Sequence, residues 1–574
     1  MPIMWPMPQD LPARTTPPRN LMLLIALAQG IALLFLWRAL SNETWPATQP
    51  AVNFPLWTVA VTYPALLLLS LESGRVKRSV TRVSPFCAVL ILPAAWTGWQ
   101  ASPYGEFPIE SLIFVYVVTI GVACFKGLMY LQHYVAEAPI AYRTLFRYSW
   151  RNALVVGLTA PLVWGVALIL FLWGALFEAI GIDFFADLFA RDWFLFPVLA
   201  VVFGLGVLIF RRLATVIDGI TSLLEGLIRL LFPLVVSVVA IFLATLPFTG
   251  LQPLWETGNG TALLMGINII ALFSANAVYQ PGRRPPYPLI VHRLLYGGAC
   301  LLPIVSVLAF YGLYLRIAQY GWTVERCWAL LLCCLMAFFS VGYSVGIVLR
   351  RDDWPETLGR VNTIMGWAIV ALTLLVNTPL LDFRSISLAS QFARVERGEI
   401  EIYDFDFHYA QQYLARPAWL RTQALLDEIR DSDERLAELI REPRSRRIPV
   451  TDAEELWERV VYRPEPFDVP DDLRPFIESS YAAPYDNLML VAVDLNQDQD
   501  LEYVLIGSTE FDVLRAEGFY RQDDEWRSLT VRRTLAESLG NEIEQSLQNG
   551  EIEAVPPEFQ DLLIGDVEFS FMPR

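Results

Sequence analysis

Residues 361–381, VNTIMGWAIVALTLLVNTPLL, are the last stretch of the chain that is long and apolar enough to cross a bilayer. A helix of about 20 residues spans a hydrocarbon core of roughly 30 Å. The sequence before this stretch has the composition of a membrane protein, whereas the sequence from residue 382 onward is polar and acidic. The side on which residues 361–381 leave the membrane therefore decides where the loops and the C-terminal region lie.

The composition is that of a multi-spanning membrane protein. Of the 574 residues 55% are hydrophobic, with 18 Trp and 34 Phe, which exceeds the usage of soluble domains. The net charge of −16 is unevenly distributed, because residues 382–574 carry 42 acidic and 20 basic side chains and the rest carries 17 and 23. The acidic region argues against a nucleic-acid partner, since it lacks the basic surplus that displaces phosphate counterions.

Length and apolarity predict eleven membrane spans. The spans cover residues 21–40, 54–71, 83–99, 109–131, 152–177, 193–210, 229–248, 261–279, 294–315, 322–349 and 361–381. Their alternation puts 19 basic side chains on one side of the membrane and four on the other. By the positive-inside rule, the N-terminus faces the cytoplasm and the C-terminal region faces the periplasm.

The expected fold class is an α-helical polytopic membrane bundle followed by a soluble α+β region. Residues 1–20 form a cytoplasmic tail and residues 21–381 the transmembrane domain. In residues 382–486 the apolar positions recur at helical spacing, which predicts a helical part of the extracytoplasmic region. In residues 487–574 the period changes to two, which predicts a small α+β domain with antiparallel strands around an acidic loop.

Two loops of the predicted cytoplasmic side contain arginines, which recur at four-residue spacing in residues 132–151. In residues 132–151 the arginines lie among aromatic side chains, which is typical of a helix on the surface of an anionic leaflet. Residues 211–229 also carry two carboxylates and predict a solvated helical hairpin. Both loops are therefore expected to form short helices outside the bilayer.

The acidic loop between two predicted strands holds the candidate metal ligands. Oxygen-bearing side chains at alternate positions converge on one hard cation when a loop wraps around it. The usual turn glycine is replaced by Gln499, and Leu505 stands where an EF-hand has its last glutamate. The loop is therefore either a weak Ca2+ site or a solvated acidic turn. The five candidate ligands are Asp494, Asn496, Asp498, Asp500 and Glu502.

A second candidate site is the segment 274–288, SANAVYQPGRRPPYP, at the end of the eighth span. Its four prolines make the loop rigid, and it carries the pair Arg283 and Arg284. The pair suits an anionic headgroup or a cytoplasmic partner. Alternatively, the arginines serve only as a topology signal beside a stiff turn.

The sequence shows no known catalytic motif in the structural context that such a motif needs. It contains no HExxH or GxxxxGK[ST] pattern, and its three histidines are far apart. GYSVG at 342–346 lies inside the predicted span 322–349, where its two glycines indicate close helix packing and not a strand–helix turn. No carboxylate or histidine lies in the middle of a predicted span, and Lys126 and Glu178 lie near span ends, from which they can snorkel. An ion-coupled pump is therefore disfavoured.

Two segments after the last span, together with the start of the basic loop, resemble a known family. SANAVYQ (274–280), together with LLDFRSISLASQFARVERGEI (380–400) and DFDFHYAQQYLARPAW (404–419), resembles domain-of-unknown-function family 4153. The resemblance extends over about residues 21–427, and VDLNQDQDLEYVLI (493–506) is similar to an acidic loop of members with an appended domain, without its usual glycines. It implies a bacterial inner-membrane protein and implies no reaction.

Three functions remain open from the sequence. The first is a non-enzymatic envelope protein, a sensor or scaffold, whose periplasmic acidic domain works with envelope protein partners and is a candidate Ca2+ binder. The second is a transporter or flippase for a small molecule or lipid. The third is a membrane enzyme acting on lipid-linked sugars, for which the acidic pair Asp183 and Asp187 would be the metal ligands. The lipid bilayer is a required partner, and the oligomeric state is left open.

Overall fold

A computed structural model describes two compact units, Met1–Ile440 and Arg441–Arg574. The residues that it describes are 17–137, 141–256, 259–283, 285–429, 433–441, 457, 460–463, 469–470, 472–480, 487–493, 501–508, 515–522, 525–529, 562–564 and 567–569.

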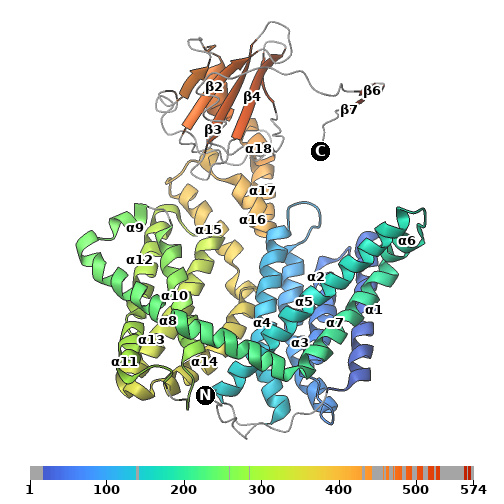
Figure 1. The fold of residues 1–574 in the computed structure, drawn as a ribbon. Helices are drawn as coiled ribbons and strands as arrows, with labels where there is room; N and C mark the ends of the chain where they lie inside the picture. The colour runs from blue at the N-terminus through green and yellow to red at the C-terminus, as the bar shows by residue number, and fades with distance from the viewer. Residues whose placement is uncertain are drawn as a thin grey trace. The chain divides into compact units, whose positions relative to one another are not determined.

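The first unit contains the membrane helices (Figure 1). Eleven helical segments of the described chain are long and apolar enough to cross a membrane, which confirms the predicted fold class. They are α1 (Arg19–Ser41), α2 (Pro50–Ser70), α3 (Val76–Gln100), α4 (Glu110–Ala136), α5 (Tyr142–Glu178), α7 (Asp192–Arg212), α8 (Ala214–Thr249), α10 (Gly260–Val278), α11 with α12 (Leu289–Ala299 and Leu302–Tyr320), α13 (Val324–Arg350) and α14 (Pro355–Leu375). The short helices α6 (Phe184–Ala190) and α9 (Gln252–Glu256) lie between spans.

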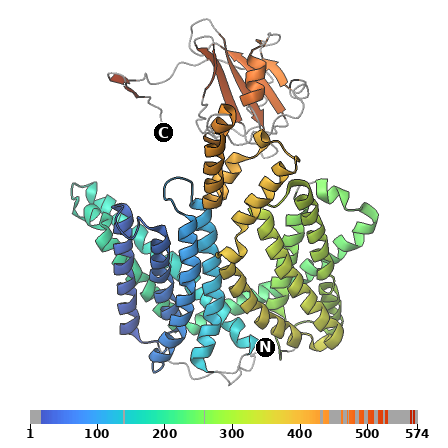
Figure 2. The ribbon, with the colours of Figure 1, turned by 180° about the vertical axis from the view of Figure 1, so that it is seen from behind.

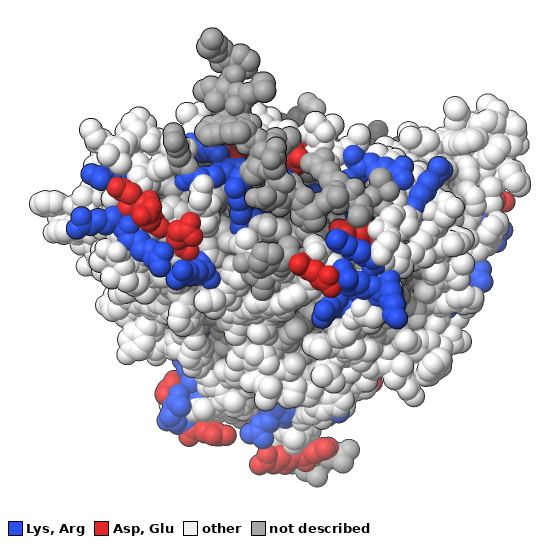
Figure 3. Space-filling model, turned by 90° about the horizontal axis from the view of Figure 1, so that it is seen from below, with Lys and Arg blue, Asp and Glu red and all other residues white. Residues whose placement is uncertain are grey.

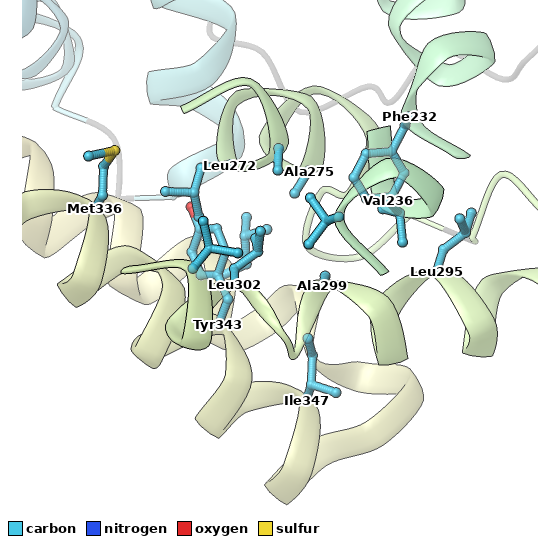
Figure 4. Packing of buried hydrophobic residues seen from close by; sticks show 14 of the residues in the cluster. Phe232, Val236, Leu272, Ala275, Leu295, Ala299, Leu302, Met336, Tyr343 and Ile347 are labelled. Carbon is cyan, nitrogen blue, oxygen red and sulfur yellow. The ribbon is translucent and has the colours of Figure 1, made fainter. Parts of the chain in front are cut away.

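These helices pack as two groups, seen from both sides in Figures 1 and 2. The first half-bundle comprises α1 to α5 and α7, in which α2 packs on α3 and α1 on α7. The second comprises α8 and α10 to α14, and Figure 4 shows side chains of α8, α10, α11, α12 and α13 meeting in its apolar core. Between the two groups α4 packs against α14, and we call this contact the seam.

Close helix packing in the first half-bundle depends on glycine. A Cβ atom placed on Gly98 of α3 would lie 2.1 Å from the carbonyl oxygen of Pro50 in α2, which is closer than any real contact. Because backbone cannot yield as a flexible side chain does, only glycine lets the two helices approach to this distance.

The prediction of short helices in the two basic loops is wrong. α5 is a single helix of 37 residues that begins at Tyr142, and α8 is a single helix of 36 residues that begins at Ala214. At 1.5 Å per residue each is about 55 Å long, far more than a bilayer core requires. Arg143, Arg147 and Arg151 therefore lie on the first turns of α5, whereas Arg211 and Arg212 end α7 and Arg229 lies within α8.

Four shorter helices follow α14 and form what we call the cap. They are α15 (Phe383–Glu396), α16 (Phe407–Tyr413), α17 (Ala415–Ile429) and α18 (Glu434–Arg441). Their apolar side chains, among them Phe383, Phe392 and Phe405, form one cluster with Trp322 and Trp328 at the beginning of α13. The cap is thus packed on the membrane helices and belongs to the first unit.

The second unit contains a five-stranded sheet in the order β1-β2-β3-β4-β5. β1 pairs with β2 in parallel and the other neighbours are antiparallel. Leu473 and Ile477 of α20 (Leu473–Ser480) pack with Leu490 and Phe519 of the sheet. The strands are β1 (Val460–Arg463), β2 (Asn487–Val493), β3 (Glu502–Ser508), β4 (Arg515–Gln522) and β5 (Glu525–Leu529), and a separate hairpin pairs β6 (Leu562–Ile564) with β7 (Val567–Phe569).

Candidate functional site

The acidic loop connects β2 to β3. Of its predicted ligands Asp494, Asn496, Asp498 and Asp500 lie outside the described residues. Glu502 is the first residue of β3, where it stands opposite Val493 and is buried. Among the described residues no group of three potential metal ligands occurs, so Asp183 and Asp187 at the start of α6 have no third ligand there.

The basic loop is fixed to α8 through Arg283. Its guanidinium lies 3.4 Å from the carboxylate of Glu225, a buried residue of α8 that also pairs with Arg229 at 3.4 Å. The Tyr287 hydroxyl donates to the Arg229 carbonyl oxygen at 2.6 Å and holds the end of the loop. Arg283 thus has a structural use as a counterion of Glu225, while Arg284 lies outside the described residues.

Charged side chains gather at one end of the first unit. Figure 3 shows clusters of Lys and Arg, with fewer carboxylates, over the end at which α3, α5, α8, α11 and α14 begin. We call it the basic end. The cap lies at the opposite end of the same unit, because it follows α14.

A network of polar side chains joins the half-bundles near the basic end. Asn276 of α10 is its hub, with its Oδ1 accepting from the Tyr142 hydroxyl of α5 at 3.2 Å and from the Asn362 amide of α14. The Tyr343 hydroxyl of α13 donates to Asn362 Oδ1 at 2.6 Å. Four helices from both half-bundles are thereby cross-linked, and the side-chain groups of the network satisfy one another. Asn276 belongs to the SANAVYQ segment.

Tyr279, His292 and Asp352 resemble a catalytic relay in their order. His292 Nδ1 lies 3.1 Å from the Tyr279 hydroxyl, and His292 Nε2 lies 3.9 Å from Asp352 Oδ1. However, Tyr279 and His292 are buried beneath Trp354 and Tyr296. The cluster is therefore a structural one.

Lys126 is a basic residue inside the membrane region. α4 continues to Ala136, so Lys126 lies about 15 Å from the helix end and close to the helix midpoint. Its side chain is shorter than this distance, so the ammonium group does not reach the end of α4, and snorkelling to the membrane surface stays a prediction. Among the described residues Lys126 makes no ion pair or hydrogen bond.

Helical spacing places Lys126 on the side of α4 that faces α14. On the same side Thr119 accepts a hydrogen bond from Asn377 at 2.8 Å, and Tyr130 donates to the carbonyl oxygen of Thr363 at 2.7 Å. Lys126 lies between these two contacts along α4 and is partly exposed. An unpaired ammonium group at the seam is the strongest candidate for a ligand-binding group in the membrane part, because a charge in the bilayer is costly.

A comparison with models of protein families identifies the family of this chain. The family model described as Domain of unknown function (DUF4153) matches residues 64–422. The chain belongs to this family. The DUF4153 match begins within α2 and ends within α17, so it includes the seam, Lys126, Asn276 and most of the cap. Neither the search of curated proteins nor that of solved structures found a match.

The DUF4153 region contains the features that the sequence did not disclose. The predicted fourth span ended at residue 131, five residues before α4 does, so Lys126 lies farther from the helix end than the sequence predicted. A continuous helical period through Gln132 and His133 was the available signal. The acidic loop lies outside the DUF4153 match.

Proposed function

We propose that this DUF4153 protein is a non-enzymatic scaffold of a bacterial inner membrane, which carries an acidic periplasmic region for envelope protein partners. The observation that carries the proposal is that the cap is bonded to both half-bundles. A scaffold needs such a fixed platform. A protein that works by rocking one half-bundle against the other would instead have to break the bonds between the cap and one of them.

The first half-bundle holds the cap through the C-terminal end of α3 and through the loop that follows it. Gln100 Nε2 donates to Asp382 Oδ2 at 2.7 Å, and both side chains are buried. Arg416 of α17 donates to the Ser102 carbonyl oxygen at 2.7 Å, and its guanidinium lies 4.3 Å from the ring centroid of Trp99. A cation over an indole face is attracted by the ring quadrupole, which strengthens this contact.

The second half-bundle holds the cap through the link between α12 and α13. The Gln391 amide of α15 donates to the Trp322 carbonyl oxygen at 2.8 Å. The backbone N–H of Val324 donates to the Tyr409 hydroxyl at 3.0 Å, and that hydroxyl lies 3.2 Å from the Glu325 carboxylate. The cap thus bridges the half-bundles opposite the basic end, which supports a rigid platform.

The proposed sidedness follows from the basic end facing the cytoplasm, as the positive-inside rule requires. A reporter fused after Arg574 tests it, with a second fusion in the loop between α13 and α14 as the control. We expect alkaline phosphatase activity from the first fusion and none from the second. The reverse pattern would contradict the periplasmic placement.

We also propose that the acidic loop binds Ca2+ weakly, supported by its alternating oxygen ligands. Calorimetry of the full-length protein in detergent should give a saturable Ca2+ signal. The signal should be lost in Asp494→Asn with Asp498→Asn and retained in the control Asp427→Asn, which removes an exposed carboxylate of α17. A signal that is absent from the wild type, or equal in all three proteins, would identify the loop as a solvated turn.

Photo-crosslinking in intact cells tests the scaffold itself. A crosslinker at Tyr413 or Leu420, both exposed on the cap, should capture a discrete envelope protein, whereas one at the lipid-facing Phe114 should not. The same product should weaken in Asp382→Ala, which loosens the cap. Capture that is equal from Phe114, or indifferent to Asp382→Ala, would count against a platform.

A second candidate, a transporter or flippase for an anionic amphiphile, is favoured by Lys126 at the seam. Lys126→Met should then abolish stabilisation of the purified protein by the transported anion, whereas Lys126→Arg should retain most of it. A scaffold predicts instead that Lys126→Met raises the unfolding temperature and leaves crosslinking from the cap unchanged, since it removes a desolvated charge. The deciding result is the effect of the anion: stabilisation that Lys126→Met abolishes supports transport, whereas a wild type that the anion does not stabilise supports the scaffold.

A further inference from the structure

An open pocket of about 470 Å³ lies at the basic end, where α3 begins. Its basic lining residues are Arg75, Lys77, Arg78 and Arg82, which come from the turn before α3 and from the first two turns of that helix. Gly74 and Thr81 complete the lining. Four cations within eight residues make this pocket a concentrated source of positive potential.

Two of the four cations are already paired. Arg75 lies 3.0 Å from the Glu72 carboxylate, and Arg78 lies 3.0 Å from the Glu137 carboxylate. Lys77 and Arg82 are exposed and make no ion pair with any residue that the structure describes. The paired arginines are thus held in place, and the other two cations are available to a ligand.

The pocket continues into an apolar helix surface. Along α3, Lys77 and Thr81 share one side of the helix with Pro85, Ala88 and Leu92, at spacings of three and four residues. All five are exposed in the first unit, and Leu92 is 70% exposed. A cationic pocket that leads directly into an exposed apolar stripe matches a molecule with an anionic head and a long apolar chain.

We propose that this pocket binds the phosphate-bearing headgroup of an anionic phospholipid, with an acyl chain lying along Pro85, Ala88 and Leu92. The charge complementarity comes from Lys77 and Arg82, and the apolar stripe distinguishes a lipid from a soluble phosphate compound. The site is separate from the seam and from the cap. Lipid binding at the pocket can therefore be tested independently of the proposed scaffold function.

The test uses the purified, delipidated full-length protein in detergent. Binding of phosphatidylglycerol is measured by native mass spectrometry for the wild type, for Lys77→Gln with Arg82→Gln, and for Arg350→Gln with Arg360→Gln. The last variant makes the same charge change at exposed positions of the same end, outside the pocket. Equal unfolding temperatures of the three proteins show that the variants fold.

We expect the pocket variant to bind phosphatidylglycerol about 30-fold more weakly, a factor of about five for each basic residue, and the control variant to bind as the wild type. Zwitterionic phosphatidylcholine should bind the wild type weakly, and millimolar inorganic phosphate should not displace the lipid. Equal losses in both variants would overturn the proposal. Phosphate that binds alone and displaces the lipid would assign the pocket to a soluble phosphate compound and overturn it as well.

Discussion

Asp382 is the residue on which attachment of the cap depends most directly. Its carboxylate accepts from the Gln100 amide at 2.7 Å, from the backbone N–H of Arg384 at 3.1 Å and from the Ser385 hydroxyl at 2.6 Å. It is therefore both the N-cap of α15 and the buried bond between the cap and α3. Asp382→Ala removes both uses and leaves the Gln100 amide buried without its partner.

The cost follows from these two uses. Loss of an N-cap destabilises a helix by about 1 kcal/mol. Loss of a buried hydrogen bond to a charged group, with its donor stranded, costs about 2 kcal/mol more. A total of about 3 kcal/mol, at about 1.4 kcal/mol per factor of ten, raises the open fraction of the cap by about 100-fold. Asp382→Asn keeps an N-cap oxygen and should lose about 1 kcal/mol.

Hydrogen–deuterium exchange of the full-length protein in nanodiscs measures this opening. In Asp382→Ala the amides of α15 and α17 should exchange about 100-fold faster, while those of α10, α12 and α13 keep their rates. Asp382→Asn should give an intermediate change. Unchanged exchange in α15 would refute the assignment of the cap's attachment to Asp382. A uniform rise across all helices would show that the cap does not open as a separate element.

Three further predictions concern packing, the polar network and pH. Gly98→Ala should destabilise the protein by about 1–3 kcal/mol in thermal unfolding, because its Cβ would meet the Pro50 backbone; an unchanged midpoint would contradict the α2–α3 contact. Asn276→Ala should lower the unfolding free energy by about 2 kcal/mol and speed exchange in α14, and exchange that rises only in α10 would refute cross-linking of the half-bundles. Burial and the Glu325 carboxylate raise the pKa of Tyr409 to about 12 from an ordinary value near 10. Because the folded state holds this proton more tightly, the stability that it contributes is complete below pH 10 and is lost between pH 10 and about 12. Tyr409→Phe should flatten the fall of the unfolding temperature over this range, and an equally steep fall would contradict the assignment.

The membrane part could be predicted from the sequence because long apolar runs are nearly unambiguous. A bilayer leaves a span no alternative to a helix, so length and apolarity suffice. The errors arose where helices continue into polar sequence, as at the beginning of α5 and α8. At the beginning of α5 the arginines at four-residue spacing were interpreted as a separate surface helix, although the same spacing also continues a spanning helix. Periodicity gives the type of an element and not where it joins its neighbour.

The candidate site was much less accessible to sequence reasoning, because it depends on which helix faces meet. Asn276 and Asn362 are far apart in the sequence, and no local pattern indicates that they bond to each other and share the Tyr343 hydroxyl. The cap's contacts with Gln100 and Ser102 are likewise formed between residues about 300 positions apart. Such pairs become visible only when the packing of the helices is known.

Polar residues within spans are the usual sign of a transport pathway, yet several of those in this protein serve as interhelical bonds. Asn268 donates to Ser306 at 2.8 Å, and Ser306 lies 3.1 Å from Ser340. Bonds of this kind contribute about 0.6–2 kcal/mol each and hold helices in register. Lys126 differs in kind, because a charge inside the bilayer costs more than such a bond contributes, and no described residue offsets that cost. The paired polar side chains are explained by packing alone. Whether Lys126 binds an anion therefore decides between a rigid scaffold and a transport pathway.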